Sequence, residues 1–113
     1  MTANEIIALV DGSLLTEEHC DHEVEYAFAA DLMSDVLTLT HDNVLFITGL
    51  VAPQTIRTAI VSDIHTLLIV RGKQVPASIV TLATENEICL LTSPYSMYRA
   101  SGELYKAGLK PVF

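Results

Sequence analysis

The stretch that decides the fold runs from Val44 to Arg71: VLFITGLVAPQTIRTAIVSDIHTLLIVR. It opens with the apolar run Val44–Thr48, and Gly49 breaks that run. A helical pattern begins at Pro53, and a second apolar run follows at Thr66–Val70. Short apolar runs of this kind are typical of strands buried on both faces, whereas the segment between them has the spacing of an amphipathic helix. The stretch therefore predicts two parallel strands joined by a helix.

Around this unit the chain continues to alternate between helices and strands. A third apolar run, Ile88–Thr92, starts about 22 residues after the second, the same interval that separates the first two. Further strands are expected at 13–16 and 25–30, and residues 110–113 form a tail or a short edge strand. Helices are expected before Gly12, opened by a capping box at Thr2 and Glu5, and at 32–40, 53–63, 76–86 and 94–107. The pattern predicts a single α/β domain over residues 1–113, with a mostly parallel sheet built from βαβ units.

Two helix starts are assigned from capping residues. Asp31 is a good N-cap for the helix at 32–40, in which Leu32 would face inward. Ser93 followed by Pro94 has the N-cap and first-turn proline that suit the last helix. The side chains of Asp31 and Ser93 are therefore expected to accept hydrogen bonds from the first backbone N–H groups of these helices.

Composition points to a protein without a membrane segment. The chain has 113 residues, of which 50% are hydrophobic, and its mean hydropathy is +0.42. No apolar stretch approaches the roughly 18 to 20 residues that a membrane span needs, and the first residues have no secretory signal pattern. The excess of apolar residues is expected in a sheet buried on both faces or in a subunit interface, which predicts a homodimer.

Charge is distributed unevenly along the chain. The net charge is −8, and all six Lys and Arg residues lie at or after Arg57. The first half carries only acidic residues, among them Glu17, Glu18, Asp21 and Glu23. Such a surface repels phosphate backbones and anionic lipids, so neither a nucleic acid nor a membrane is expected as a partner. The acidic half is either a solvated face or a surface that meets the basic half of a second subunit.

The cysteines and histidines give no strong site signature. Cys20 and Cys89 are far apart in the sequence, so no disulfide framework is expected and a cytoplasmic location is predicted. His19, Cys20, Asp21 and His22 have metal-ligand chemistry, but a structural zinc site needs paired ligands and no second pair follows. Cys20 beside two histidines in a polar loop is also not a catalytic triad. We expect neither a metal nor a catalytic residue.

Four blocks of sequence, taken in order, carry a family resemblance. They are DHEVEYAFAADLMSDVL from Asp21, LFITGL, LLIVRGK and LLTSPYSMYRASGELYKAGL. Together they resemble a DRTGG domain, most closely the small stand-alone versions of anaerobic bacteria, and they cover nearly the whole chain. The most specific parts are Asp31–Val36 and Ser96–Leu109. Where the family's name-giving segment has Arg, Thr and two glycines, this chain has His22, Glu25, Tyr26 and Ala27.

The resemblance implies both a fold and a type of function. The implied fold is a three-layer α/β/α domain like the N-terminal domain of HPr kinase, often dimeric. The implied role is regulatory rather than catalytic. Relatives lie beside CBS pairs in pyrophosphatases and within phosphotransacetylases, and stand-alone copies accompany iron-only hydrogenase genes.

A ligand site is expected where the strands end. In open α/β sheets, ligands bind outside the carboxyl ends of the strands, close to the N-termini of helices. Arg71 and Lys73 would add positive charge there, which favours an anion such as a nucleotide phosphate. The resemblance adds the block that begins at Asp31. The candidate binding residues are Asp31, Ser34, Asp35, Thr48, Gly49, Arg71, Gly72, Lys73, Ser93 and Ser96.

The same residues have a structural alternative. Ordinary turn and cap chemistry explains the strand ends, and Asp35 near a helix N-terminus is favourable without any ligand. Neither GxxxxGK[ST] nor GxGxxG occurs, so neither common type of phosphate loop is present.

Three functions follow, in order of preference. The first is a non-catalytic regulatory or interaction module, a homodimer that senses a small anionic, nucleotide-like ligand and needs no cofactor. The second is an accessory protein of a hydrogenase or another redox enzyme, acting by protein contact alone. The third, a phosphoryl-transfer enzyme, is disfavoured because the phosphate loop is missing.

Overall fold

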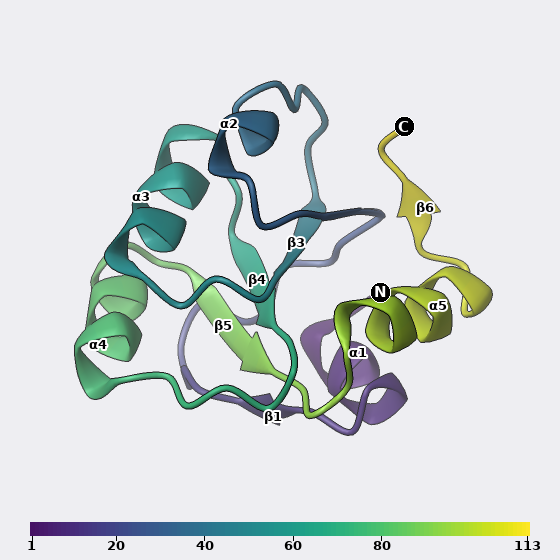
Figure 1. Ribbon diagram of the computed structural model, residues 1–113, viewed down its shortest axis with the longest axis horizontal. Coiled ribbons are helices and arrows are strands. Elements are labelled where there is room, and N and C mark those ends of the chain that lie inside the picture. Colours follow the sequence, from purple (N-terminus) through teal and green to yellow (C-terminus); the bar gives the residue numbers. More distant parts are fainter.

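The computed structural model describes residues 1–113 and contains five helices and six strands (Figure 1). The helices are α1 (Ala3–Leu9), α2 (Met33–Val36), α3 (Pro53–Val61), α4 (Ala77–Glu85) and α5 (Met97–Lys106). The strands are β1 (Ser13–Leu14), β2 (Tyr26–Ala29), β3 (Val44–Thr48), β4 (Thr66–Ile69), β5 (Cys89–Thr92) and β6 (Lys110–Pro111). No helix has both the length and the apolar character that crossing a bilayer would require.

The strands form one sheet in the order β1-β5-β4-β3-β2-β6. Strands β2, β3, β4 and β5 are parallel to one another, and β6 runs parallel to β2 at one edge. Only β1, at the other edge, is antiparallel. The three predicted apolar runs are the adjacent strands β3, β4 and β5, joined through α3 and α4. The predicted βαβ architecture is therefore confirmed, and the last residues form an edge strand.

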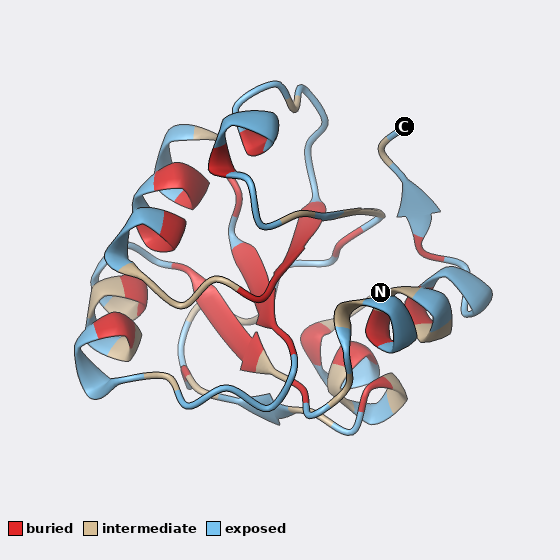
Figure 2. Ribbon diagram, in the orientation of Figure 1, coloured by how far each residue is buried: buried red, intermediate tan, exposed pale blue.

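Helices cover the sheet on both faces (Figure 1). Helices α1 and α5 pack on one face with one set of strand residues, which includes Leu45, Leu68 and Leu91. Helices α2, α3 and α4 pack on the other face with the alternate set, which includes Phe46 and Leu67. Because both faces are covered, every residue of β3 and β4 is buried (Figure 2). This three-layer α/β/α arrangement confirms the predicted fold class.

The start of α1 follows the predicted capping box. The Glu5 N–H donates to Thr2 Oγ1 at 3.2 Å, and the Thr2 N–H donates to Glu5 Oε1 at 3.1 Å. Donation from the Thr2 N–H favours the ionised carboxylate and is the main reason that the pKa of Glu5 is below its ordinary value. Pro53 lies in the first turn of α3, also as predicted.

The helix predicted at 32–40 is much shorter than expected. Only Met33–Val36 is helical, and Leu32 is 61% exposed instead of facing inward. The N-cap position is occupied by Leu32, which makes no side-chain capping bond. Asp31 does not cap this helix because its carboxylate is bonded to another strand, so the segment lacks the stabilisation that a longer helix would need.

The structure also contains a disulfide that the sequence did not predict. Cys20 and Cys89 are bonded across 69 positions of sequence, with their Cα atoms 4.9 Å apart. Cys89 begins β5, and the loop that carries Cys20 passes the amino end of that strand. The expectation that two such distant cysteines stay unpaired was therefore wrong.

Candidate functional site

The carboxyl ends of four parallel strands meet at one edge of the sheet, called here the carboxyl edge. The residues that follow β2, β3, β4 and β5 all leave the sheet on this side. The edge gathers most of the predicted binding residues. They are Asp31, Thr48, Gly49, Arg71, Gly72, Lys73, Ser93 and Ser96.

Asp31 connects the ends of β2 and β3. Its Oδ1 accepts a hydrogen bond from the Gly49 N–H at 2.7 Å and another from the Thr48 hydroxyl at 3.1 Å. Thr48 is fully buried, so these bonds fix the carboxylate over the end of β3. Asp31 Oδ2 makes no hydrogen bond to the protein. Asp31 is thus a positioning group for the Gly49 turn with one oxygen still available.

Gly49 lies between Asp31 and the side chain of Arg71. A Cβ atom at position 49 would be 3.5 and 3.7 Å from the two carboxylate oxygens of Asp31 and 3.8 Å from Arg71 Nε. The glycine thus leaves a carboxylate and a guanidinium close to the same backbone turn. They are not an ion pair, because no Lys or Arg nitrogen in the protein lies within 4.0 Å of a carboxylate oxygen. Both groups can therefore serve a ligand.

The turn after β4 holds Arg71 in an unusual backbone conformation. Arg71 and Gly72 have φ values of 70° and 63°, in the left-handed region. For a residue with a side chain this conformation costs roughly 1 to 2 kcal/mol. Two hydrogen bonds offset the cost: the Arg71 N–H donates to Tyr95 O at 2.7 Å, and the Gly72 N–H donates to Ser93 O at 2.9 Å. The turn is thereby fixed to the segment that leads into α5, while Arg71 and Lys73 stay exposed.

The two predicted serines have structural partners. Ser93 is buried; its hydroxyl donates to Val10 O at 2.6 Å and accepts from the Tyr95 N–H at 3.1 Å. Ser96 caps α5 by accepting from the Arg99 N–H at 3.1 Å. The prediction that Ser93 is the N-cap of the last helix was wrong, because this hydroxyl is turned toward the end of α1.

Sequence reasoning missed Arg99 at this edge. Its guanidinium carbon lies 3.7 Å from the centroid of the Tyr95 ring, a cation–π contact. The signal was the position of Tyr95 just before the N-cap Ser96, four residues ahead of Arg99, which lets its ring lie against the first turn of α5. Arg71, Lys73 and Arg99 now give the edge three cations near the N-termini of α3 and α5.

Ser34 and Asp35 are not joined to this cluster. They lie on α2, a helix of four residues, and their side chains make no hydrogen bond or ion pair with another residue. Their place in the candidate site therefore stays a prediction.

Comparison with known proteins identifies the family. The sequence profile of the DRTGG domain matches residues 5–107. The chain belongs to the DRTGG domain family. Its fold is similar to a crystal structure of the CBS and DRTGG domains of the regulatory region of Clostridium perfringens pyrophosphatase, complexed with the activator diadenosine tetraphosphate. The TM-score is 0.70 at 14% identity, and the match covers 91% of this chain and 45% of that one. No curated protein sequence matches the chain significantly.

At the amino ends of the strands of this DRTGG domain, His19, Cys20 and His22 each contact a different residue. The His22 ring stacks on His65 with 4.9 Å between centroids, and His19 Nε2 lies 3.7 Å from Glu18 Oε2. Cys20 is bonded to Cys89. The residues that sequence alone placed together thus point to three different neighbours. The absence of a bound metal stays a prediction, testable by elemental analysis of the protein and of His22→Ala.

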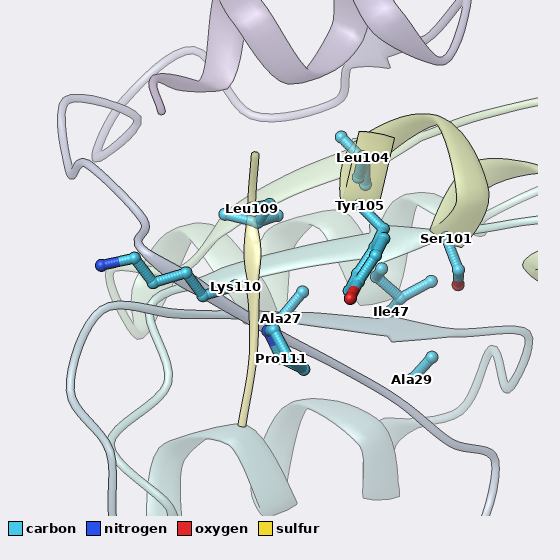
Figure 3. Close-up of a pocket in the computed structure, with 9 residues that line it drawn as sticks. All are labelled: Ala27, Ala29, Ile47, Ser101, Leu104, Tyr105, Leu109, Lys110 and Pro111. Carbon is cyan, nitrogen blue, oxygen red and sulfur yellow. The ribbon is translucent and has the colours of Figure 1, made fainter. Parts of the chain in front are cut away.

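An apolar hollow of the DRTGG domain lies on the face of the sheet that carries α5 (Figure 3). It has a volume of about 110 Å³ and is lined by Ala27, Ala29, Ile47, Ser101, Leu104, Tyr105, Leu109, Lys110 and Pro111. The Ser101 hydroxyl is buried there without a hydrogen-bond partner. Two tyrosines of α5, Tyr98 and Tyr105, are 91% and 68% exposed. We call these two tyrosines and the hollow the α5 face.

Proposed function

We propose that this protein is a non-catalytic, cytoplasmic regulatory module that binds a small anionic, nucleotide-like ligand at the carboxyl edge. The observation that carries the proposal is the convergence of unpaired cations on two helix N-termini. Arg71 and Arg99 are free of carboxylate partners there, and backbone hydrogen bonds fix the turn that carries Arg71. Anions are stabilised at such places by the helix dipoles and by charge-assisted hydrogen bonds.

The geometry also favours one chemical class of anion. Arg71 suits a phosphate oxygen, while the free Oδ2 of Asp31 is an acceptor for a hydroxyl or amino group on the same ligand. A nucleotide carries both kinds of group. The similar regulatory region of the pyrophosphatase was crystallised with diadenosine tetraphosphate, which also belongs to this class. A regulatory role agrees with membership of the DRTGG family.

A thermal-shift titration tests the ligand. The probes are diadenosine tetraphosphate, ATP, AMP and inorganic phosphate, each with the wild type and two variants. A ligand at a hundred times its Kd adds about 2.7 kcal/mol to the free energy of unfolding. Arg71→Ala should weaken the binding of a nucleotide by about 1.5 to 3 kcal/mol, the usual loss for a hydrogen bond to a charged group.

Lys110→Ala is the matched control for Arg71→Ala. Lys110 begins β6 at the other edge of the sheet, so this variant removes the same charge from a distant place. It should leave nucleotide affinity nearly unchanged. Equal losses in the two variants would mean that only net charge matters and would reject the site. No shift with any probe would reject the ligand.

We further propose that the module is a homodimer that uses the α5 face. Exposed tyrosines beside an apolar hollow are typical of protein interfaces, where aromatic side chains supply much of the binding energy. Light scattering should give a dimer mass for the wild type and a monomer mass for Tyr105→Glu. Val61→Glu changes an exposed apolar residue on α3, which is 75% exposed, and should leave the dimer intact.

The second candidate function is contact with a redox enzyme and no small ligand. The same exposure of Tyr98 and Tyr105 favours it. The two candidates differ in the thermal-shift result, because an accessory protein needs no anion. A silent nucleotide panel, together with a hydrogenase that binds the wild type but not Tyr105→Glu, would favour the accessory role.

A further inference from the structure

The loop that carries Cys20 is held to the protein at very few points. Residues 17–23 contribute no hydrogen bond through their backbone, either as donors or as acceptors. The flanking residues are well fixed. The Thr16 hydroxyl accepts from the Leu90 N–H at 3.0 Å, and Val24 exchanges hydrogen bonds with Met1 at 2.8 and 2.9 Å. The acidic loop is therefore a span with two anchored ends.

Between its two anchored ends, the loop is attached to the rest of the protein chiefly by the disulfide. Cys20 lies near the middle of the span, and its partner Cys89 is fully buried at the start of β5. Cys20 also packs against the core cluster that contains Cys89, and the His22 ring stacks on His65. The Glu18–His19 pair joins two residues of the loop itself. Without the disulfide, little would oppose separation of the loop from the sheet.

We propose that Cys20 and Cys89 form a reversible thiol–disulfide site that controls this loop. In the oxidised protein the disulfide holds the acidic loop against the amino end of β5. In the reduced protein the loop is released, and the shallow hollow of about 460 Å³ that the loop forms with the body of the protein is lost, which uncovers Ala3, Asn4 and Leu14. That hollow is lined by Ala3, Asn4, Leu14, Glu17, His19, Cys20 and Asp21.

The unequal exposure of the two sulfurs gives them different roles. Cys20 is partly exposed, whereas Cys89 is 0% exposed. An external thiol or disulfide can therefore reach Cys20, and Cys89 reacts only with Cys20. The arrangement corresponds to an attacking cysteine at the surface and a resolving cysteine in the core.

The oxidation is balanced with glutathione disulfide as the oxidant. The Cys20 thiolate attacks one sulfur of glutathione disulfide, whose S–S bond breaks, and one glutathione leaves as a thiolate. The Cys89 thiol then loses its proton, and its sulfur attacks Cys20 Sγ and displaces the second glutathione. Two electrons pass from the protein to glutathione disulfide, and the two protons end on the two glutathione thiols. Reduced glutathione reverses both steps.

Alkylation with a maleimide tests the chemistry. Protein equilibrated with glutathione disulfide should take up no maleimide while folded. After equilibration with reduced glutathione, the folded protein should take up one, at Cys20, and Cys89 should react only after unfolding. A protein that stays reduced with glutathione disulfide, or a disulfide that resists reduced glutathione, would overturn the proposal.

Proteolysis with a glutamate-specific protease tests the release of the loop. The loop contains Glu17, Glu18 and Glu23, whereas Glu85 and Glu103 lie in helices and serve as internal references. Cleavage in the loop should be about tenfold faster in the reduced protein, since cleavage follows the population of the open form. Cleavage at Glu85 and Glu103 should not change.

Two variants separate redox state from the reagents. Cys20→Ser and Cys89→Ala should both show the fast loop cleavage of the reduced protein, with or without glutathione. Because Cys20→Ser alters a partly exposed position, it remains informative if Cys89→Ala fails to fold. Equal cleavage rates for the oxidised protein, the reduced protein and Cys20→Ser would overturn the proposed control of the loop.

Discussion

The two edges of the sheet are built in different ways. At the carboxyl edge, hydrogen bonds of 2.6 to 2.9 Å fix the chain at Gly49, Arg71, Gly72 and Ser93. At the amino edge, seven residues of the acidic loop, 17–23, have no backbone hydrogen bond, and a disulfide is their main attachment. The carboxyl edge thus has a fixed geometry, whereas the shape of the amino edge depends on one covalent bond.

The edges also differ in charge. The carboxyl edge presents Arg71, Lys73 and Arg99, and the acidic loop presents Glu17, Glu18, Asp21 and Glu23. A rigid cationic edge can recognise an anion without a large cost of ordering. A loosely attached acidic loop repels anions and changes its position cheaply. The carboxyl edge is thus suited to binding an anion, and the acidic loop at the amino edge is suited to changing its position.

The largest expected effect concerns the disulfide. Urea unfolding of the oxidised and reduced proteins should differ by up to about 4 kcal/mol, because a cross-link over 69 positions restricts the unfolded chain. The midpoint should fall on reduction. Cys20→Ser should unfold like the reduced wild type and should not respond to the reductant. A midpoint that is the same in both redox states would contradict the comparison of the edges.

The next effect compares two serines whose hydroxyl groups are buried. Ser93→Ala should lower the free energy of unfolding by about 1 to 3 kcal/mol, because the buried Val10 carbonyl and Tyr95 N–H lose their partner. Ser101→Ala is the control: its hydroxyl is buried but unpartnered, so its removal should be neutral or stabilising. Equal losses would show that burial matters here and hydrogen bonding does not.

A smaller effect is expected at Asp31. Asp31→Ala should cost about 1 kcal/mol in urea unfolding, since it removes an exposed carboxylate that accepts from the Gly49 N–H and the Thr48 hydroxyl. Asp21→Ala removes the same charge from the acidic loop and should change stability very little. If Asp21→Ala were the more damaging substitution, the carboxyl edge would not be the more firmly bonded one.

The smallest effect concerns the capping box. The largest cause of the lowered pKa of Glu5 is the hydrogen bond from the Thr2 backbone N–H, and the Thr2 side chain adds a smaller effect. Thr2→Ala keeps the backbone donor and removes the side chain, so it should raise the pKa of Glu5 only part of the way toward its ordinary value. In the wild type this carboxylate stabilises the fold above its unfolded-state pKa, and the contribution is lost as the pH falls through the lower folded-state pKa. An NMR titration of Glu5 in both proteins measures the change. A pKa that does not move would show that the Thr2 side chain does not contribute to the shift.

How much was predictable depended on whether an interaction is local in sequence. Apolar runs located β3, β4 and β5, and the capping box at Thr2 needed only a spacing of three residues. The gathering of Thr48, Gly49 and Arg71 at one edge followed from parallel topology alone. Contacts between residues that are far apart in the sequence could not be recognised from any short stretch of it. Asp31 bonds to a residue 18 positions away, Ser93 to one 83 away and Cys20 to one 69 away.

Those long-range partners explain the errors. Asp31 and Ser93 have good N-cap chemistry, but their side chains form hydrogen bonds at the end of β3 and at the end of α1 instead. Neither side chain therefore caps the helix that was predicted for it. The two cysteines looked isolated because only the path of the loop past β5 brings them together.

The two outer strands carry a consequence for self-association. Strands β1 and β6 have two residues each, and β6 ends in Pro111, which has no N–H to donate. Very short edge strands are poor templates for another strand, and the lysine and proline of β6 weaken that edge further, so a second copy cannot readily extend the sheet. Fibril growth through main-chain pairing is thereby hindered even at high protein concentration. Copies of the protein can then contact one another mainly through helix surfaces, where the side chains determine the specificity of the contact.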